Sequence, residues 1–150
     1  QWVNTKKQLE RAGMLDKGKV APYLAFRRKL FLEMHRAGVP MIMASDSPQV
    51  FNVPGFSIHH EIALMSEAGM SNLEILKTGA LVPAQYMGAT NSWGQIKEGF
   101  EADFVLVEQN PLLDLKTLQK PVGVVIRGKW IGREELQSQL DRIEKNHLRN

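Results

Sequence analysis

The sequence predicts an α/β protein, because helical and strand-like patterns share one chain. A helical pattern that ends at Gly38 is followed at once by a short apolar run, residues 41–45, and the two make one αβ unit of a parallel sheet or barrel. From Trp93 onward, apolar residues recur with a period of two between glycine turns, which indicates a small β-rich region. A last helical pattern runs from Arg133 to about Lys145.

The elements of the first half follow from their boundary residues. Residues 5–12 are expected as a short helix and residues 16–19 as a loop. The longer helix opens with Pro22 near its first turn and closes at Gly38, the usual placement of proline and glycine. Because residues 41–45 are apolar without a helical period, they are expected as a buried parallel strand.

Three further helices are predicted before the β-rich region. Residues 47–57 form a loop that is too long and too apolar for a simple connector, and such loops often line pockets. A helix then starts at Ile58 or His59 and stops at Gly69, and Ser71 with Glu74 makes a capping box that begins the next helix. Pro83 to Met87 gives a third short helix.

The β-rich region and the closing helix complete the prediction. The expected strands are residues 104–107, 122–126 and 129–131, with Arg127-Gly128 as the turn between the last two. In the closing helix Leu136, Leu140 and Ile143 share one stripe.

Composition limits the classes of function. A chain of 150 residues that is 43% hydrophobic and 23% charged can bury a core, and without cysteine it has no disulfide or thiolate site. No apolar stretch approaches the roughly 20 residues of a membrane span, so none is expected. The chain begins at Gln1 without an initiator methionine or a signal-peptide pattern, so we expect a piece of a longer protein. The compartment stays open, with the cytoplasm favoured, because any signal peptide would lie upstream of Gln1.

The basic character of the chain is concentrated at its start. The net charge is +3, and residues 1–38 hold nine Lys/Arg against three Asp/Glu. The densest run, Arg27-Arg28-Lys29, lies within a helical pattern, so a solvated helix face is favoured over a phosphate-binding patch. We therefore expect no nucleic-acid partner.

Asp46 is the first candidate for a functional residue. It follows the predicted strand 41–45 directly, and the carboxyl ends of parallel strands are where active sites gather in α/β proteins. Aspartate just after a strand is also a common turn former that bonds a nearby backbone N–H. The segment alone leaves both roles open.

Several ordered blocks between His35 and Trp130 resemble the C-terminal part of the amidohydrolase superfamily, in particular its imidazolonepropionase-like and prolidase-like members. The blocks are His35-Arg36-Ala37-Gly38-Val39 leading to Ala44-Ser45-Asp46-Ser47, His59-His60-Glu61-Ile62 with Glu67-Ala68-Gly69-Met70-Ser71, Pro83-Ala84 to Gly88, Gly94 to Gly99 with Ala102-Asp103, Asn110-Pro111-Leu112, and Val125-Ile126-Arg127-Gly128-Lys129. Their order and spacing together are more specific than any one block.

The resemblance implies the C-terminal part of a (β/α)8 TIM-like barrel, part of a small β-sandwich domain and a C-terminal helix. Residues 1–92 would be the barrel part with 41–45 as its last strand, residues 93–132 the sandwich strands, and residues 133–150 the C-terminal helix.

The resemblance also implies a metal-dependent hydrolase that attacks the C–N bond of an amide, peptide or cyclic amide with metal-activated water. Asp46 matches the aspartate of the last strand, which in the family binds the metal and shuttles the proton. The cofactor would be a divalent metal, zinc, as one or two ions. The His-X-His pair, the mid-barrel Lys or Glu and two later histidines of the family have no match here, so we expect them upstream of Gln1.

This chain alone is therefore expected to be incomplete and inactive. Its expected partners are a small-molecule amide or peptide substrate, the missing N-terminal portion of the same protein, and further copies in a homo-oligomer.

The sequence departs from the family pattern at three positions. Ala44 stands where the family usually has Gly, and Ala80 and Val82 stand where it often has Thr and Asn.

The remaining candidates lie in and after the loop 47–57. Phe51 and Phe56 are expected to wall the substrate pocket. His59 is a candidate for substrate contact, with a structural histidine that bonds a loop backbone as the equal alternative. His60 and His35 are expected at the surface.

A second class of function remains open. The chain could be a non-catalytic assembly or regulatory module of amidohydrolase fold that has lost the metal site, and the missing ligands favour this alternative. The retained Asp46 with its pocket-like loop favours the enzyme, and a His-X-His pair in the upstream sequence would decide between them.

Overall fold

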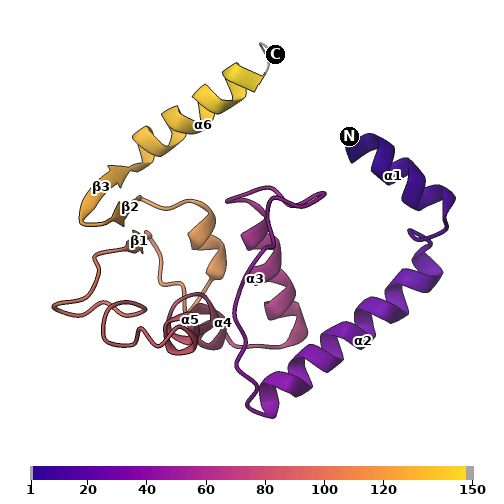
Figure 1. The fold of residues 1–150 in the computed structure, drawn as a ribbon, viewed down its shortest axis with the longest axis horizontal. Helices are drawn as coiled ribbons and strands as arrows, with labels where there is room; N and C mark the ends of the chain where they lie inside the picture. Colours follow the sequence, from indigo (N-terminus) through magenta and orange to yellow (C-terminus); the bar gives the residue numbers. More distant parts are fainter. Residues whose placement is uncertain (1, 148–150) are drawn as a thin grey trace. The chain divides into compact units, whose positions relative to one another are not determined.

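The computed structural model describes residues 2–147 (Figure 1). The chain divides into two compact units, and the boundary along the sequence falls between Gly79 and Ala80. The first unit is helical, and the second holds a small antiparallel sheet, so the predicted α/β class is confirmed in this coarse form. Within residues 2–147 no helix combines the length and the apolar character needed to cross a membrane.

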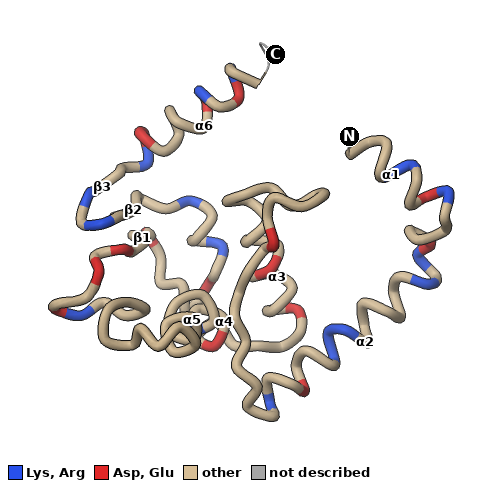
Figure 2. Tube along the Cα trace, viewed as in Figure 1, with Lys and Arg blue, Asp and Glu red and all other residues tan. Residues whose placement is uncertain are grey.

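Four helices make up the first unit: α1 (Trp2–Arg11), α2 (Lys17–Arg36), α3 (Ser57–Ala68) and α4 (Asn72–Gly79). Helix α2 begins earlier than predicted, because Asp16 acts as its N-cap and its side chain accepts a hydrogen bond of 2.8 Å from the backbone N–H of Gly18. Pro22 therefore lies inside the helix instead of in its first turn. Lys and Arg recur along α1 and α2, where basic residues outnumber acidic ones in the sequence (Figure 2).

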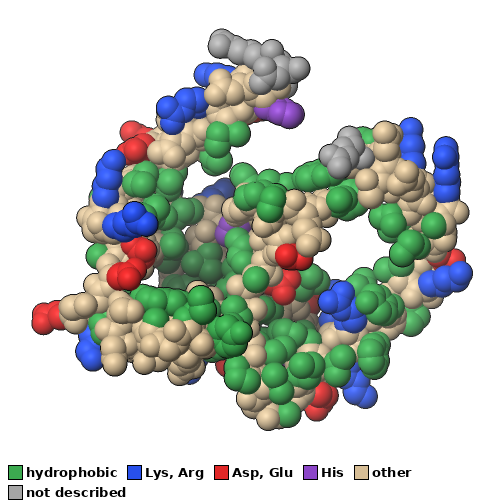
Figure 3. Space-filling model, in the orientation of Figure 1, with side chains coloured by type: hydrophobic (Ala, Val, Ile, Leu, Met, Phe, Trp, Pro, Cys, Tyr) green, Lys and Arg blue, Asp and Glu red, His purple; other side chains and the backbone are tan. Residues whose placement is uncertain are grey.

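The core of the first unit lies between α2, α3 and α4, since α3 packs against both of the others. Ile62, Met65, Met70 and Ile75 are buried there. Helix α3 stops at Gly69, whose φ of 105° lies in the left-handed region that glycine adopts without steric cost, as the sequence predicted. Hydrophobic side chains nevertheless reach the surface along α2, among them Tyr23, Phe26 and Leu30 (Figure 3).

The predicted buried strand over residues 41–45 is not found in this form. The segment is extended but pairs with no strand among the described residues, and Ile42 is 41% exposed. A strand depends on partners for its ladder of hydrogen bonds, and the described residues supply only one such bond, from Met43 N to Thr78 O at 3.0 Å.

The second unit contains α5 (Leu81–Tyr86), β1 (Phe104–Leu106), a 3-10 helix η1 (Leu115–Gln119), β2 (Gly123–Ile126), β3 (Lys129–Gly132) and α6 (Arg133–His147). The strands form one antiparallel sheet in the order β1-β2-β3, with Phe104 opposite Val125 and Val125 opposite Trp130. No second sheet faces it within residues 2–147, so the sandwich stays a prediction, as does the division at 92 and 132. Residues 148–150 of the predicted C-terminal helix lie outside the described residues.

The turn between β2 and β3 confirms the predicted hairpin. Arg127 and Gly128 both have positive φ, 50° and 76°, as a two-residue turn of the I′ type requires. Asp103 accepts a hydrogen bond from the backbone N–H of Arg127, and Gly128 N donates to Ala102 O at 3.1 Å. The Ala-Asp pair thus holds the hairpin in place.

Candidate functional site

Asp46 stands at the end of the extended segment, just before the long loop. Helix α2 ends in a turn at Gly38, where φ is 81° and Val39 N donates to Met34 O at 3.0 Å. The chain then runs extended to Asp46, which has a positive φ of 54°, a conformation that aspartate tolerates better than most residues.

The carboxylate of Asp46 is exposed and makes no hydrogen bond or ion pair with any other residue in the range 2–147. The hydroxyl groups of the flanking Ser45 and Ser47 bond to each other at 3.0 Å instead. A turn former would direct its carboxylate to a nearby backbone N–H, and this contact is not seen. The side chain is therefore available to a ligand.

The loop after Asp46 is held by its own hydrogen bonds at its C-terminal end. Val53 N donates to the hydroxyl of Ser57 at 2.8 Å, and Ser57 N donates back to Val53 O at 2.9 Å, which fixes the entry into α3. Phe51 has a φ of 66°, and its ring centroid lies 5.8 Å from that of Trp2. Phe56 is exposed, and no ring contact or hydrogen bond within the described residues joins either phenylalanine to Asp46.

His59 lies in the first turn of α3 and is half-buried. Burial, and then the neighbouring His60, lower the pKa of its imidazole below the ordinary value of 6.5. The lowered pKa favours the neutral ring, the form that can accept a proton or a metal. The alternative of a structural histidine predicts a bond to loop backbone, and no such side-chain bond is found within the described part of the chain.

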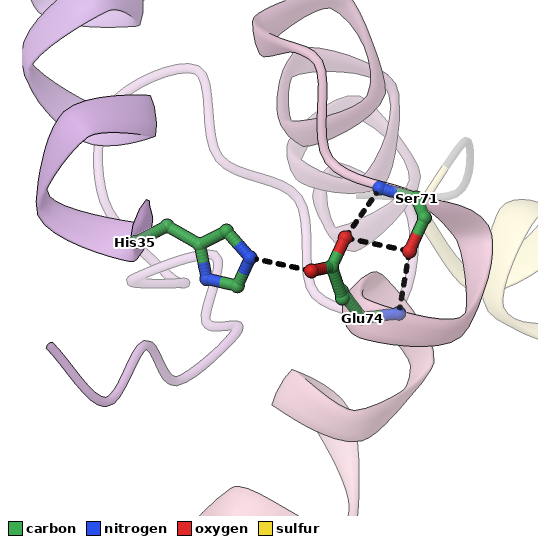
Figure 4. A network of polar contacts seen from close by, with 3 residues as sticks. All are labelled: His35, Ser71 and Glu74. Atoms are coloured by element: carbon green, nitrogen blue, oxygen red, sulfur yellow. Dashed lines mark hydrogen bonds and ion pairs between the residues drawn. The ribbon is translucent and has the colours of Figure 1, made fainter. Parts of the chain in front are cut away.

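A polar cluster of His35, Ser71 and Glu74 joins α2 to α4, and the contact of His35 with Glu74 was not predicted from the sequence (Figure 4). The Nε2 atom of His35 lies 2.9 Å from Oε1 of Glu74, while Oε2 of Glu74 accepts hydrogen bonds from the backbone N–H of Ser71 at 2.8 Å and from its hydroxyl at 2.6 Å. The capping box of Ser71 and Glu74 is thereby confirmed. His35, which was expected at the surface, is partly buried: its side chain is 24% exposed and pairs with Glu74.

The hydrogen bonds of this cluster keep Glu74 charged. Those from Ser71, and then that from His35, lower the pKa of Glu74 to about 2. A carboxylate at the start of α4 also suits the helix dipole. The cluster fixes the last turn of α2 against the first turn of α4. The Ser-x-x-Glu spacing signals the capping box in the sequence, but nothing in the sequence signals the contact with His35.

A cleft lies between α2 and α3 in the first unit. Its volume is about 240 Å3, and its lining combines apolar residues with three charged ones, namely Leu24, Arg27, Arg28, Phe31, Glu61, Leu64, Met65 and Ala68. Arg28 forms an ion pair with Glu67 beside it. Asp46 does not line this cleft.

The metal-binding capacity of this part of the chain is limited. No group of three or more His, Cys, Asp or Glu side chains that could hold a metal ion occurs within residues 2–147. Asp46 offers one oxygen ligand of the kind divalent metals accept. The described residues can thus contribute to a metal site but do not complete one.

The chain is similar to several hydrolases in sequence or in fold. Ochratoxinase from Aspergillus niger is 34% identical over 91 residues, which are 59% of this chain and 18% of that protein. A solved Xaa-Pro dipeptidase with methionine bound in its active site superposes with a TM-score of 0.63 at 22% identity, over 70% of this chain and 25% of that one. A candidate prolidase from Bifidobacterium longum superposes with a TM-score of 0.61 at 28% identity, over 73% of this chain and 28% of that one.

The chain spans less than a third of each of these proteins. The sequence pattern of the amidohydrolase family matches residues 12–131, a stretch that includes the extended segment with Asp46, the polar cluster and the hairpin. The match covers most of the sequence, so this chain belongs to the amidohydrolase family.

Proposed function

We propose that this chain is part of a hydrolase that cleaves the C–N bond of an amide, peptide or cyclic amide, with Asp46 as the acid-base residue. The unpartnered carboxylate of Asp46 carries the proposal, because it is exposed at the end of an extended segment inside the family match. The similarity to ochratoxinase and to a candidate prolidase supports the substrate class.

The reaction requires one proton to move twice. The oxygen of water bonds to the carbonyl carbon and Asp46 accepts the proton that this water loses. When the C–N bond breaks, the same carboxyl group gives the proton to the leaving nitrogen, so the products are a carboxylic acid and an amine. A divalent ion such as zinc, held in part by Asp46, would lower the pKa of the attacking water towards neutrality.

Completion of the site requires residues beyond this chain. We propose that the missing ligands belong to an N-terminal portion of the same protein, which would also cover the exposed apolar residues of α2 such as Tyr23 and Phe26. Because N–H groups alternate in direction along an extended chain, those of Ile42 and Ala44 lie on the edge opposite Met43 N and could pair with a strand of that portion. Further copies in a homo-oligomer could cover surface that remains.

The second candidate function is a non-catalytic module of the same fold. One observation favours it: the described residues contain no cluster of three metal-ligating side chains. The sequence upstream separates the two, since an enzyme requires further histidine or carboxylate ligands there.

The test uses the full-length protein and Asp46→Asn, which keeps the shape of the side chain and removes the proton acceptor. With an N-acyl amino acid or a dipeptide as substrate, kcat should fall on the order of 100-fold or more. Asp16→Asn is the matched control, because asparagine caps a helix as well as aspartate does and the charge change is the same. A kcat close to wild type in Asp46→Asn would remove Asp46 from the mechanism.

A further inference from the structure

Two aromatic side chains from distant parts of the sequence meet within the first unit. Trp2 is the first residue of α1, and Phe51 belongs to the loop that follows Asp46. Their ring centroids lie 5.8 Å apart, with an angle of 56° between the ring planes. This spacing and tilt are within the range that aromatic pairs prefer. The contact therefore joins α1 to the loop that begins next to the candidate acid-base residue.

Both rings keep a large open surface after this contact. Trp2 is 43% exposed and Phe51 is 46% exposed, and no third ring packs on either of them within residues 2–147. Val50 and Val53, which flank Phe51 in the loop, are exposed as well. Large apolar side chains that gather at the surface mark a place where something binds. The aromatic pair is thus available to a further apolar group.

The backbone of Phe51 adopts a conformation that phenylalanine rarely takes. Asn52 N donates to Gln49 O at 3.0 Å, so Phe51 occupies the third position of a tight turn, and its φ is 66°. A positive φ at this position usually goes with glycine or asparagine. Strained residues of this kind gather at active sites and ligand-binding loops. The backbone alone would be better served by glycine, so the reason for a phenylalanine lies in its ring.

The aromatic pair lies near Asp46 along the chain. Phe51 follows Asp46 by five residues, which at full extension would separate their Cα atoms by roughly 18 Å at most. The turn between Gln49 and Asn52 makes the actual path shorter. The side chains of Asp46 and Phe51 span part of the remaining distance. A substrate whose C–N bond lies at Asp46 can therefore extend an apolar group as far as the two rings.

We propose that Trp2 and Phe51 together bind an aromatic group of the substrate, so that the enzyme prefers amides that carry one. The inference rests on the proposed function of Asp46 and deepens it, because it names a class of substrate. It also gives α1 a role. The family match begins at residue 12, so Trp2 lies outside the stretch that the family pattern describes, whereas Phe51 lies inside it.

The test is Trp2→Ala in the full-length protein, with three substrates. N-acetylphenylalanine carries a ring on the amine side of the scissile bond, N-benzoylalanine carries one on the acyl side, and N-acetylalanine is the small reference. The wild type should prefer one of the aromatic substrates to the reference. In Trp2→Ala this preference in kcat/KM should fall on the order of tenfold, mainly through KM, because a ring contact is lost. The values for N-acetylalanine should stay nearly unchanged.

Two further variants separate substrate binding from a structural role. Trp2→Phe keeps a ring and should retain most of the preference. Leu15→Ala is the matched control, since Leu15 is also 43% exposed and follows α1 but offers no ring, and it should leave the preference unaltered. If Trp2 only held the loop in place, Trp2→Ala would lower kcat/KM for all three substrates alike. That result would overturn the inference.

Binding of the reaction products tests the aromatic pair without turnover. Calorimetry with phenylalanine and with benzoate should show that one of them binds the wild type, and that its Kd rises on the order of tenfold in Trp2→Ala. Binding of neither product, an unchanged Kd, or a wild type without preference for an aromatic substrate would overturn the inference even if Asp46→Asn is inactive. Activity retained in Asp46→Asn would instead overturn the proposed function of Asp46, and product binding would still decide on the aromatic pair.

Discussion

Removal of the Ser71 hydroxyl should loosen α4 by a predictable amount. In Ser71→Ala the helix loses the hydroxyl that bonds Glu74 Oε2 at 2.6 Å and Glu74 N at 3.3 Å. Loss of such a cap typically costs about 1 kcal/mol. Since 1.4 kcal/mol corresponds to a factor of ten, the helix should open about fivefold more often.

Native-state hydrogen exchange of the full-length protein measures this opening directly. The amides of residues 75–79 should exchange about fivefold faster in Ser71→Ala, whereas Ser66→Ala, an exposed change on α3, should leave them unaltered. Unchanged exchange of residues 75–79 in Ser71→Ala would refute the view that the capping box stabilises α4.

Three further predictions follow from the same unit. Ile75 is fully buried, so Ile75→Ala should lower the free energy of unfolding, measured by urea titration, by about 2–5 kcal/mol. Leu73 is half exposed, so Leu73→Ala should lower the free energy of unfolding clearly less. The pKa of Glu74 is lowered from 4.5 to about 2, so the contribution of its carboxylate to the stability of the folded state is complete above pH 4.5 and is lost as the pH falls towards 2. The melting temperature of Glu74→Gln should lack this dependence on pH. The pKa of His59 is lowered below 6.5, so the folded state binds fewer protons and stability should fall as the pH drops through 6.5; an NMR titration of the ring that gives 6.5 or higher would contradict this.

Features that depend on neighbouring residues were predictable from the sequence. The capping box of Ser71 and Glu74 and the turn at Arg127 and Gly128 each need only a few adjacent residues, and both were confirmed. The start of α2 was placed too late because Pro22 was given more weight than Asp16, although Asp16 is a good N-cap.

Features that depend on distant partners were not predictable in the same way. The apolar run 41–45 has the composition of a strand, but strand pairing requires a neighbour, and the described residues hold only the bond from Met43 to Thr78. His35 and Glu74 are 39 positions apart, and no periodicity links them. The cleft between α2 and α3 is lined by none of Asp46, His59, Phe51 and Phe56, so the roles of these residues stay predictions.

The measurement that tests the central claim most directly is a crystal structure of the full-length protein with the metal identified by anomalous scattering. The proposal that Asp46 serves in a metal-dependent hydrolase predicts a divalent ion about 2.0–2.2 Å from a carboxylate oxygen of Asp46, with its other ligands from residues outside this chain. A complete metal site elsewhere in the protein, or no metal together with an Asp46 carboxylate that faces solvent, would contradict it.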